Sequence, residues 1–97
     1  MKLNKPAMAG TLESSDCQVT VSPGQGLSIE LESSVMAQFG QQIEAVVRDS
    51  LKRLGVEDAK VVVNDKGALD CTIRSRVETA VFRSIDKDKD IPWEALQ

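Results

Sequence analysis

The chain has 97 residues, of which 41% are hydrophobic, 28% charged and only 3% aromatic, and its formal net charge is −3. This length suits one small domain, which we expect to span residues 1–97 with a modest aliphatic core. The negative charge and the scarcity of aromatic side chains argue against nucleic acid and against an anionic membrane surface as partners.

The first part of the chain predicts a pair of strands. After a polar start at residues 1–6, which we expect to be a loose tail, "AMAGTL" (7–12) is apolar enough for a strand. "CQVTV" (17–21) alternates, which puts its odd-numbered residues on one face of a second strand. The turn residues of "ESSD" (13–16) predict a hairpin tip between them, and "SPGQG" (22–26) predicts another turn.

A third strand and a long helix follow. "LSIELE" (27–32) alternates again, with its leucines and isoleucine facing inward. Residues 35–54 predict an amphipathic helix, for which Ser33 or Ser34 is the candidate cap and Gly55 the terminating residue. Its apolar positions recur at intervals of three and four: Val35, Met36, Phe39, Ile43, Val46, Val47, Leu51 and Leu54.

The last third contains one ambiguous segment. "AKVVVN" (59–64) is β-branched and predicts a buried strand. "ALDCTI" (68–73) alternates like a strand, yet apolar residues continue at every fourth position, and we therefore favour a helix from about Leu69 to Ser84. The charged residues 86–97 predict a flexible tail; whether Trp93 in it docks on the domain or on a partner is left open.

The predicted element order is β-β-β-α-β-α. We expect an α+β fold in which a small sheet of about four strands carries two helices packed on one face.

Few residues offer independent catalytic chemistry. The chain has no histidine and no tyrosine, and histidine is the commonest general base near neutral pH. Cys17 and Cys71 each fall in an apolar pattern, so we expect both to be buried and predict no metal site. Residues 1–10 carry positive charges but lack the apolar h-region of a secretory signal, and no run is long and apolar enough to span a bilayer; we therefore expect a cytoplasmic protein.

Two groups of serines are candidates for covalent modification. Asp49-Ser50-Leu51 looks like the attachment triplet of ordinary acyl carrier proteins, but it falls near the end of a predicted helix and inside its apolar stripe. We expect Ser50 to be a small helix residue bonded to its own backbone. Ser14 and Ser15, at the predicted hairpin tip, are accessible to a modifying enzyme, although serines are also common in unmodified turns.

Four separated blocks give a more specific indication. They are "AGTLESSD", "FGQQIEAVV", "DKGALDCTIRSRVETA" and "PWE". In this order and spacing they resemble the γ subunit of bacterial citrate lyase, which is its acyl carrier protein. The resemblance covers nearly the whole chain.

The resemblance implies a role for one serine. The matching residue is Ser14, which would carry 2'-(5''-phosphoribosyl)-3'-dephospho-CoA through a phosphodiester; the residue pattern alone does not separate Ser14 from Ser15. The terminal thiol of this arm would hold acetyl and citryl thioesters while citrate is cleaved to acetate and oxaloacetate. The implied partners are the α (acyl transferase) and β (citryl lyase) subunits, a prosthetic-group transferase and an acetylating ligase. The carrier itself would be non-catalytic.

The polar side of the last predicted helix is a candidate contact surface for such partners. Arg74, Arg76, Glu78 and Arg83 line it. The alternative is a solvated face with helix-spaced pairs such as Arg74 and Glu78.

Two other functions remain open. The carrier subunit of malonate decarboxylase bears the same kind of arm. From a different class, the chain would be an unmodified α+β interaction module whose "ESSD" is only a turn.

Overall fold

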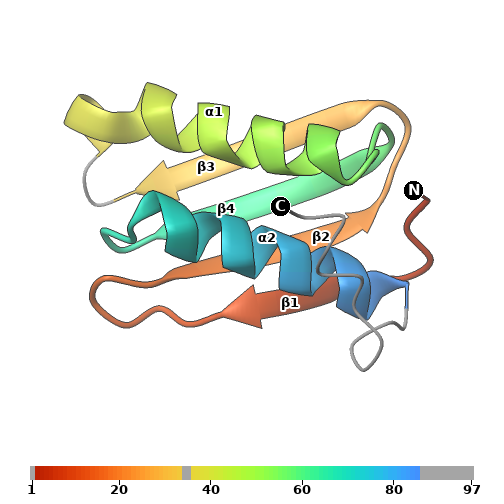
Figure 1. Ribbon diagram of the computed structural model, residues 1–97, viewed down its shortest axis with the longest axis horizontal. Coiled ribbons are helices and arrows are strands. Elements are labelled where there is room, and N and C mark those ends of the chain that lie inside the picture. The colour runs from red at the N-terminus through yellow and green to blue at the C-terminus, as the bar shows by residue number, and fades with distance from the viewer. Residues whose placement is uncertain (1, 34–35, 86–97) are drawn as a thin grey trace.

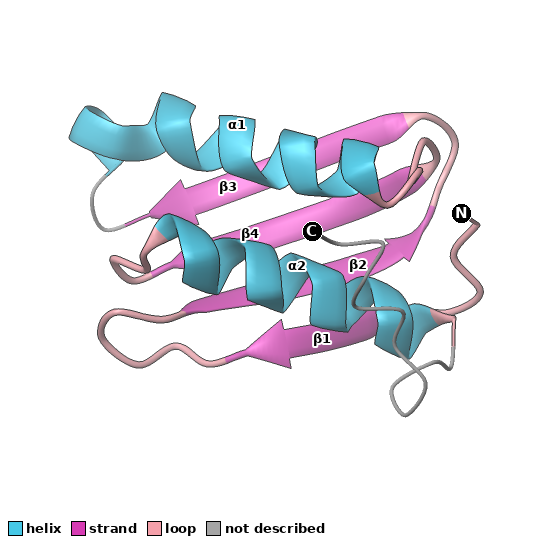
Figure 2. Ribbon diagram, viewed as in Figure 1, coloured by secondary structure: helices cyan, strands magenta, loops and turns pink. Residues whose placement is uncertain are grey.

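The predicted element order is confirmed. We describe residues 2–33 and 36–85 of a computed structural model, without the side chains of residues 36–38. The elements follow one another as β1 (Ala7–Gly10), β2 (Cys17–Pro23), β3 (Leu27–Ser33), α1 (Met36–Arg53), β4 (Ala59–Asp65) and α2 (Asp70–Ser84). Figure 2 shows the two helices lying on the same side of the sheet, as expected for this α+β class.

The four strands form one mixed sheet in the order β1-β2-β4-β3. β1 pairs antiparallel with β2 and β2 antiparallel with β4, whereas β3 runs parallel to β4 (Figure 1). β4 therefore lies between two strands that are consecutive in sequence. The short connection from β2 to β3 passes the start of β4, where the Ala59 amide donates a hydrogen bond to the Gly26 carbonyl at 3.0 Å.

The core lies between the sheet and the helices. The inward side chains of β2 and β4, among them Val19, Val21, Val61 and Val63, are completely buried. The inward residues of β3 are only half-buried, because β3 is an edge strand. On the other face of the sheet, alternate positions such as Met8 and Val62 are exposed. The predicted alternation is thus confirmed in β2 and β3, the two strands for which it was drawn.

α1 ends at the predicted glycine. Gly55 has a φ of 70°, its amide donates to the Lys52 carbonyl at 3.0 Å, and the Val56 amide donates to the Leu51 carbonyl at 2.9 Å. This pair of bonds is the Schellman arrangement, in which a left-handed glycine closes the last helical turn. At the other end, Ser33 is the last residue of β3 and donates its hydroxyl to Asp65 at 2.8 Å.

The ambiguous segment at residues 68–73 enters a helix at Asp70, as favoured. After β4 the chain leaves the sheet at Gly67, whose φ is 90°, and Asp65 accepts hydrogen bonds from the Gly67 and Ala68 amides, both at 3.0 Å. α2 then begins at Asp70. One prediction here is wrong: Cys71 is exposed, because the helical period turns it away from the core. Cys17, in β2, is buried as predicted.

The expectation of a loose segment at residues 1–6 does not hold for Leu3 and Lys5. Leu3 is part of the buried core. The Ser84 hydroxyl donates to the Lys5 carbonyl at 2.5 Å, which joins this segment to the end of α2. Apolar burial and a backbone hydrogen bond therefore hold the chain before β1 in place.

The predicted tail at 86–97, with Trp93, lies outside the described residues. None of the described helices is long and apolar enough to cross a membrane.

Candidate functional site

The predicted hairpin tip is a loop that projects beyond the end of the sheet. It connects β1 to β2 and is the orange-red loop at the left of Figure 1. Residues 11–15 are exposed and Asp16 is half-buried. The two candidate serines, Ser14 and Ser15, are therefore both accessible, as predicted.

Two residues with left-handed backbone shape this loop. Gly10 has a φ of 92°, and a Cβ added there would lie 1.8 Å from the Cys17 carbonyl oxygen. Only glycine fits such a close approach of two backbones. Ser15 has a φ of 65°, and the Asp16 amide donates to the Glu13 carbonyl at 3.2 Å. Residues 13–16 thus form a tight turn with Ser14 and Ser15 at its centre.

Asp16 holds the base of the loop. Its carboxylate accepts a hydrogen bond from the Thr11 hydroxyl at 2.7 Å and from the Cys17 amide at 2.7 Å. Two further bonds come from the Arg76 guanidinium on α2, each 3.0 Å long. These bonds, chiefly those from Arg76 and Thr11, hold the pKa of Asp16 well below its usual range. The loop is therefore tied to α2 through a carboxylate that stays ionised.

The backbone of Ser15 is anchored as well. Its amide donates to the Lys66 carbonyl at 2.8 Å, and the Lys66 amide donates to the Asp16 carbonyl at 2.9 Å. These bonds continue the pairing of β2 with β4 past the end of the strands. Within the part of the chain that the structure describes, the hydroxyls of Ser14 and Ser15 make no hydrogen bond. The loop thus has a fixed base and presents two unbonded hydroxyls at its tip.

Ser50 behaves as predicted. It is only 2% exposed, and its hydroxyl donates to the Val46 carbonyl at 2.8 Å. A modifying enzyme would have to unwind α1 to reach it. The Asp-Ser-Leu triplet at this position is therefore a feature of helix packing.

The polar side of α2 is tied to other elements. Arg74 donates to Asp49 of α1 at 2.7 Å, so its ion pair runs between the helices, and the expected pairing with Glu78 is not the contact that it makes. Arg83 donates to the Met8 carbonyl of β1 at 2.8 Å. Arg76 bonds the loop through Asp16. These three arginines have structural roles, and contact with partner subunits stays a prediction for this side of the helix.

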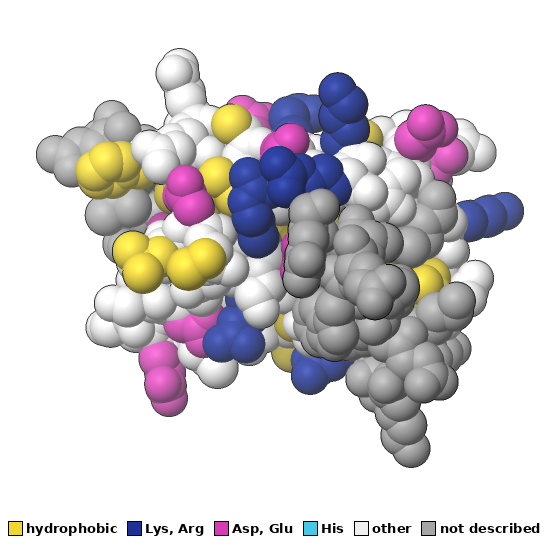
Figure 3. Space-filling model, viewed as in Figure 1, with side chains coloured by type: hydrophobic (Ala, Val, Ile, Leu, Met, Phe, Trp, Pro, Cys, Tyr) yellow, Lys and Arg dark blue, Asp and Glu magenta, His cyan; other side chains and the backbone are white. Residues whose placement is uncertain are grey.

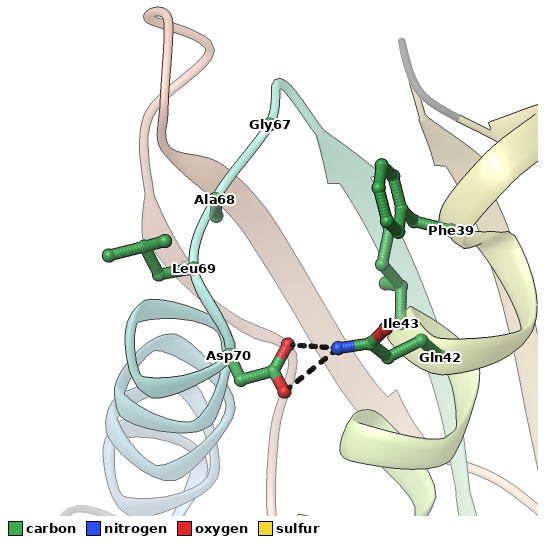
Figure 4. Close-up of a pocket in the computed structure, with 7 residues that line it drawn as sticks. All are labelled: Phe39, Gln42, Ile43, Gly67, Ala68, Leu69 and Asp70. Carbon is green, nitrogen blue, oxygen red and sulfur yellow. Dashed lines mark hydrogen bonds between the residues drawn. The ribbon is translucent and has the colours of Figure 1, made fainter.

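A groove lies at the same end of the molecule as the loop. It has a volume of about 380 Å³ and is lined by the start of α1 and the connection from β4 to α2. Figure 4 shows Phe39 and Ile43 projecting from α1 toward that connection. Gln42 reaches across and donates to both oxygens of Asp70, at 3.3 and 3.2 Å. Sequence reasoning missed this groove, because Phe39 read simply as a core residue; the side chain is 47% exposed.

The Arg76–Asp16 pair was also missed. The two residues are 60 positions apart, and no local spacing connects them. The residue types alone could not predict the pair, because only the strand order brings the start of β2 next to α2.

Among the described residues, no group of three or more histidine, cysteine or carboxylate side chains is arranged to hold a metal ion.

Comparison with known proteins agrees with this architecture. Residues 4–84 match a family of acyl carrier proteins described as the malonate decarboxylase delta subunit. One solved structure, a Pseudomonas malonate decarboxylase hetero-tetramer in complex with malonate, has a chain with the same fold. The TM-score is 0.61 at 21% identity, over 86% of this chain and 91% of that one.

Sequence relatives are much closer. The citrate lyase acyl carrier protein of Haemophilus influenzae (strain PittEE) is 56% identical over 96 residues, which cover 99% of both chains. That of Albidiferax ferrireducens is 56% identical over the full length of both chains. That of Lacticaseibacillus casei is 52% identical over 99% of this chain and 95% of its own. The chain with its protruding serine loop therefore belongs to the family of citrate lyase acyl carrier proteins.

Proposed function

We propose that this chain serves as the carrier subunit of a citrate lyase complex, with phosphoribosyl-dephospho-CoA bound covalently to Ser14. The observation that carries the proposal is the Ser14 hydroxyl, which is exposed and unbonded on a loop with a fixed base. Ser15 has a backbone tied to Lys66, whereas Ser14 has no such backbone bond among the described residues. This difference favours Ser14 as the residue that a transferase can grip and modify.

The residues around Ser14 fit a large group linked through a phosphodiester. Glu13 and Ser15 on either side are exposed, so the protein leaves room at the point of attachment. The negative charge of Asp16 is compensated by the bidentate bond from Arg76. This compensation limits the repulsion between the loop and a phosphate at its tip.

The chain's own contribution is placement. When bound, the group supplies a terminal thiol, which holds acyl groups as thioesters. The chain has no histidine, and the lowered pKa of Asp16 makes this carboxylate a poor general acid and a weak base near neutral pH. What the loop provides is a tether, which raises the effective concentration of the carried group at two successive active sites.

The proposed partners follow from this division of labour. An α subunit would exchange the acyl group, a β subunit would cleave the citryl unit, and a separate transferase and ligase would attach and acetylate the arm. We propose the cytoplasm as the setting, since a reducing compartment keeps the terminal thiol of the arm free.

A malonate decarboxylase carrier is the second candidate. It is favoured by the matching family description and by the fold of the Pseudomonas chain. The higher identity of 52–56% to citrate lyase carriers argues for the first candidate. The partner subunits select the substrate, so reconstitution with citrate lyase or malonate decarboxylase subunits separates the two by which acid is consumed.

The site assignment is tested by transfer of the group in vitro. Purified chain is incubated with the transferase and the activated prosthetic group, and its mass is followed over time. We expect Ser14→Ala to fold normally and to gain no mass, while Ser15→Ala and Ser50→Ala are still labelled. Labelling of Ser14→Ala at the wild-type rate would overturn the assignment.

A further inference from the structure

We infer that the groove between α1 and the β4–α2 connection is a docking site for the pantetheine part of the chain's own arm. The inference rests on the proposed attachment at Ser14. Docking would shield the terminal thiol, or an acyl group on it, from solvent while the carrier is between partner subunits.

The position of the groove is the first argument. The Ser15 amide bonds to the Lys66 carbonyl at 2.8 Å, and the residue after Lys66, Gly67, lines the groove. An arm that leaves Ser14 therefore starts beside one wall of it. Two smaller hollows, one lined by Leu27 and Val56 and the other by Lys2 and Asp58, adjoin Gly55 after the far end of α1.

The chemistry of the lining is the second argument. Pantetheine has two amides, a pair of geminal methyl groups and a terminal thiol. Phe39 and Ile43 offer an apolar wall for the methyl groups (Figure 4). The Gln42 amide nitrogen already donates to Asp70, so Gln42 offers its carbonyl oxygen as an acceptor for a pantetheine amide. The volume of about 380 Å³ falls in the range of small-molecule sites.

The surface around the groove is the third argument. Figure 3 shows hydrophobic side chains at the left end of the helical face, where α1 and α2 begin. Phe39 and Leu69, at these two starts, are 47% and 71% exposed. In Figure 4 Leu69 points away from the groove, so the apolar surface extends beyond it. A tethered ligand needs little intrinsic affinity to fill such a site, because attachment keeps its local concentration high.

The test compares chain with and without the arm. All samples carry Cys71→Ser, because the exposed Cys71 thiol would otherwise react with the water-soluble disulfide that is used in the second readout below. The arm is attached enzymatically and confirmed by mass, and NMR spectra of the two forms are assigned. We expect the resonances of Phe39, Gln42 and Ile43 on α1 to shift on attachment, in addition to those of the loop.

A second readout is the rate at which the arm thiol reacts with a water-soluble disulfide. We expect this rate to be about three-fold lower than that of free pantetheine. This factor corresponds to an arm that is docked about two thirds of the time and whose thiol reacts only while it is undocked. Phe39→Ala should return the rate to that of free pantetheine. Met8→Ala, at a residue 50% exposed on the other face of the sheet, should leave it slow.

The outcomes separate the inference from the function on which it rests. If no mass is gained at Ser14, the proposed function fails and the docking site with it. If mass is gained but only loop resonances shift, and the thiol reacts as fast as free pantetheine, attachment stands and docking is overturned. If the α1 resonances of the unmodified chain shift with protein concentration, a second copy covers the groove and the inference is wrong.

Discussion

Replacing Gly10 with alanine is expected to destabilise the protein more than the same change at Gly67. The two glycines have nearly the same φ, 92° and 90°, so the backbone cost of a left-handed alanine is similar at both, about 1–3 kcal/mol. Their surroundings differ. A Cβ at Gly67 meets nothing within 4 Å, whereas at Gly10 it lies 1.8 Å from the Cys17 carbonyl oxygen.

The extra cost at Gly10 follows from what must move. Cys17 is completely buried and pairs with Asp65 of β4, so its carbonyl cannot withdraw without disturbing the sheet. Overpacking of this kind costs about 1–3 kcal/mol. The free energy of unfolding should therefore fall by about 1–3 kcal/mol more in Gly10→Ala than in Gly67→Ala.

Urea unfolding followed by far-ultraviolet circular dichroism measures the difference. With a slope of about 2 kcal/mol/M for a chain of this size, the two midpoints should differ by roughly 0.5–1.5 M. The dependence of the free energy of unfolding on urea concentration must be the same in both variants, because only then does the difference in midpoints report a difference in stability. Equal midpoints would refute the reasoning, because they would mean that β1 and β2 do not approach each other as described at the base of the serine loop.

Three further predictions concern single side chains. A depressed carboxyl pKa stabilises the fold above the unfolded-state pKa, and this contribution is lost as pH falls through the folded-state value. The pKa of Asp16 lies below its ordinary value of 3.8, so Asp16→Asn should lower the melting temperature at neutral pH. In this variant the melting temperature should also fall less steeply than in the wild type as the pH drops below about 5. The same decrease in the melting temperature with acid in both proteins would contradict the role of Asp16. Cys71 should react with a thiol reagent in the native protein and Cys17 should not, since burial raises the pKa of Cys17 to about 11. Reaction of two thiols without denaturant would disprove this. Ser50→Ala should lower the free energy of unfolding by less than about 1.5 kcal/mol. The lost bond leaves the Val46 carbonyl to its backbone partner in the helix, and the contact from Arg74 to the hydroxyl is long, at 3.5 Å, while Arg74 keeps its bond to Asp49. A larger loss would show that the Ser50 hydroxyl helps to hold α1 and α2 together.

Much of the fold was predictable because the relevant signals are local. Alternation in β2 and β3 identified their buried faces, and the position of Gly55 gave the end of α1. The same local reasoning placed Ser50 in the apolar stripe and rejected it as an attachment site. Each of these features depends on residues a few positions apart.

The features that sequence reasoning missed depend on long-range placement. Nothing near β2 indicates that β4 inserts between it and β3. The Asp16–Arg76 bond and the groove beside Phe39 both follow from that arrangement, because they join elements distant in the chain. Cys71 was misassigned because its burial was inferred from the alternation of residues 69–73, whereas α2 follows a helical period that turns Cys71 away from the core.

The proposal that Ser14 is the modified residue rests on the resemblance, and the residue pattern alone does not select it. The loop brings Ser14 and Ser15 to the same tip with both hydroxyls exposed. Only the tied backbone of Ser15 distinguishes the two.

The central claim is most directly tested by the intact mass of the chain from its native host during growth on citrate, with fragmentation to locate any adduct. The account predicts the added mass of phosphoribosyl-dephospho-CoA on Ser14. An unmodified chain in cells that are cleaving citrate would contradict it and leave the loop as a simple turn of an interaction module.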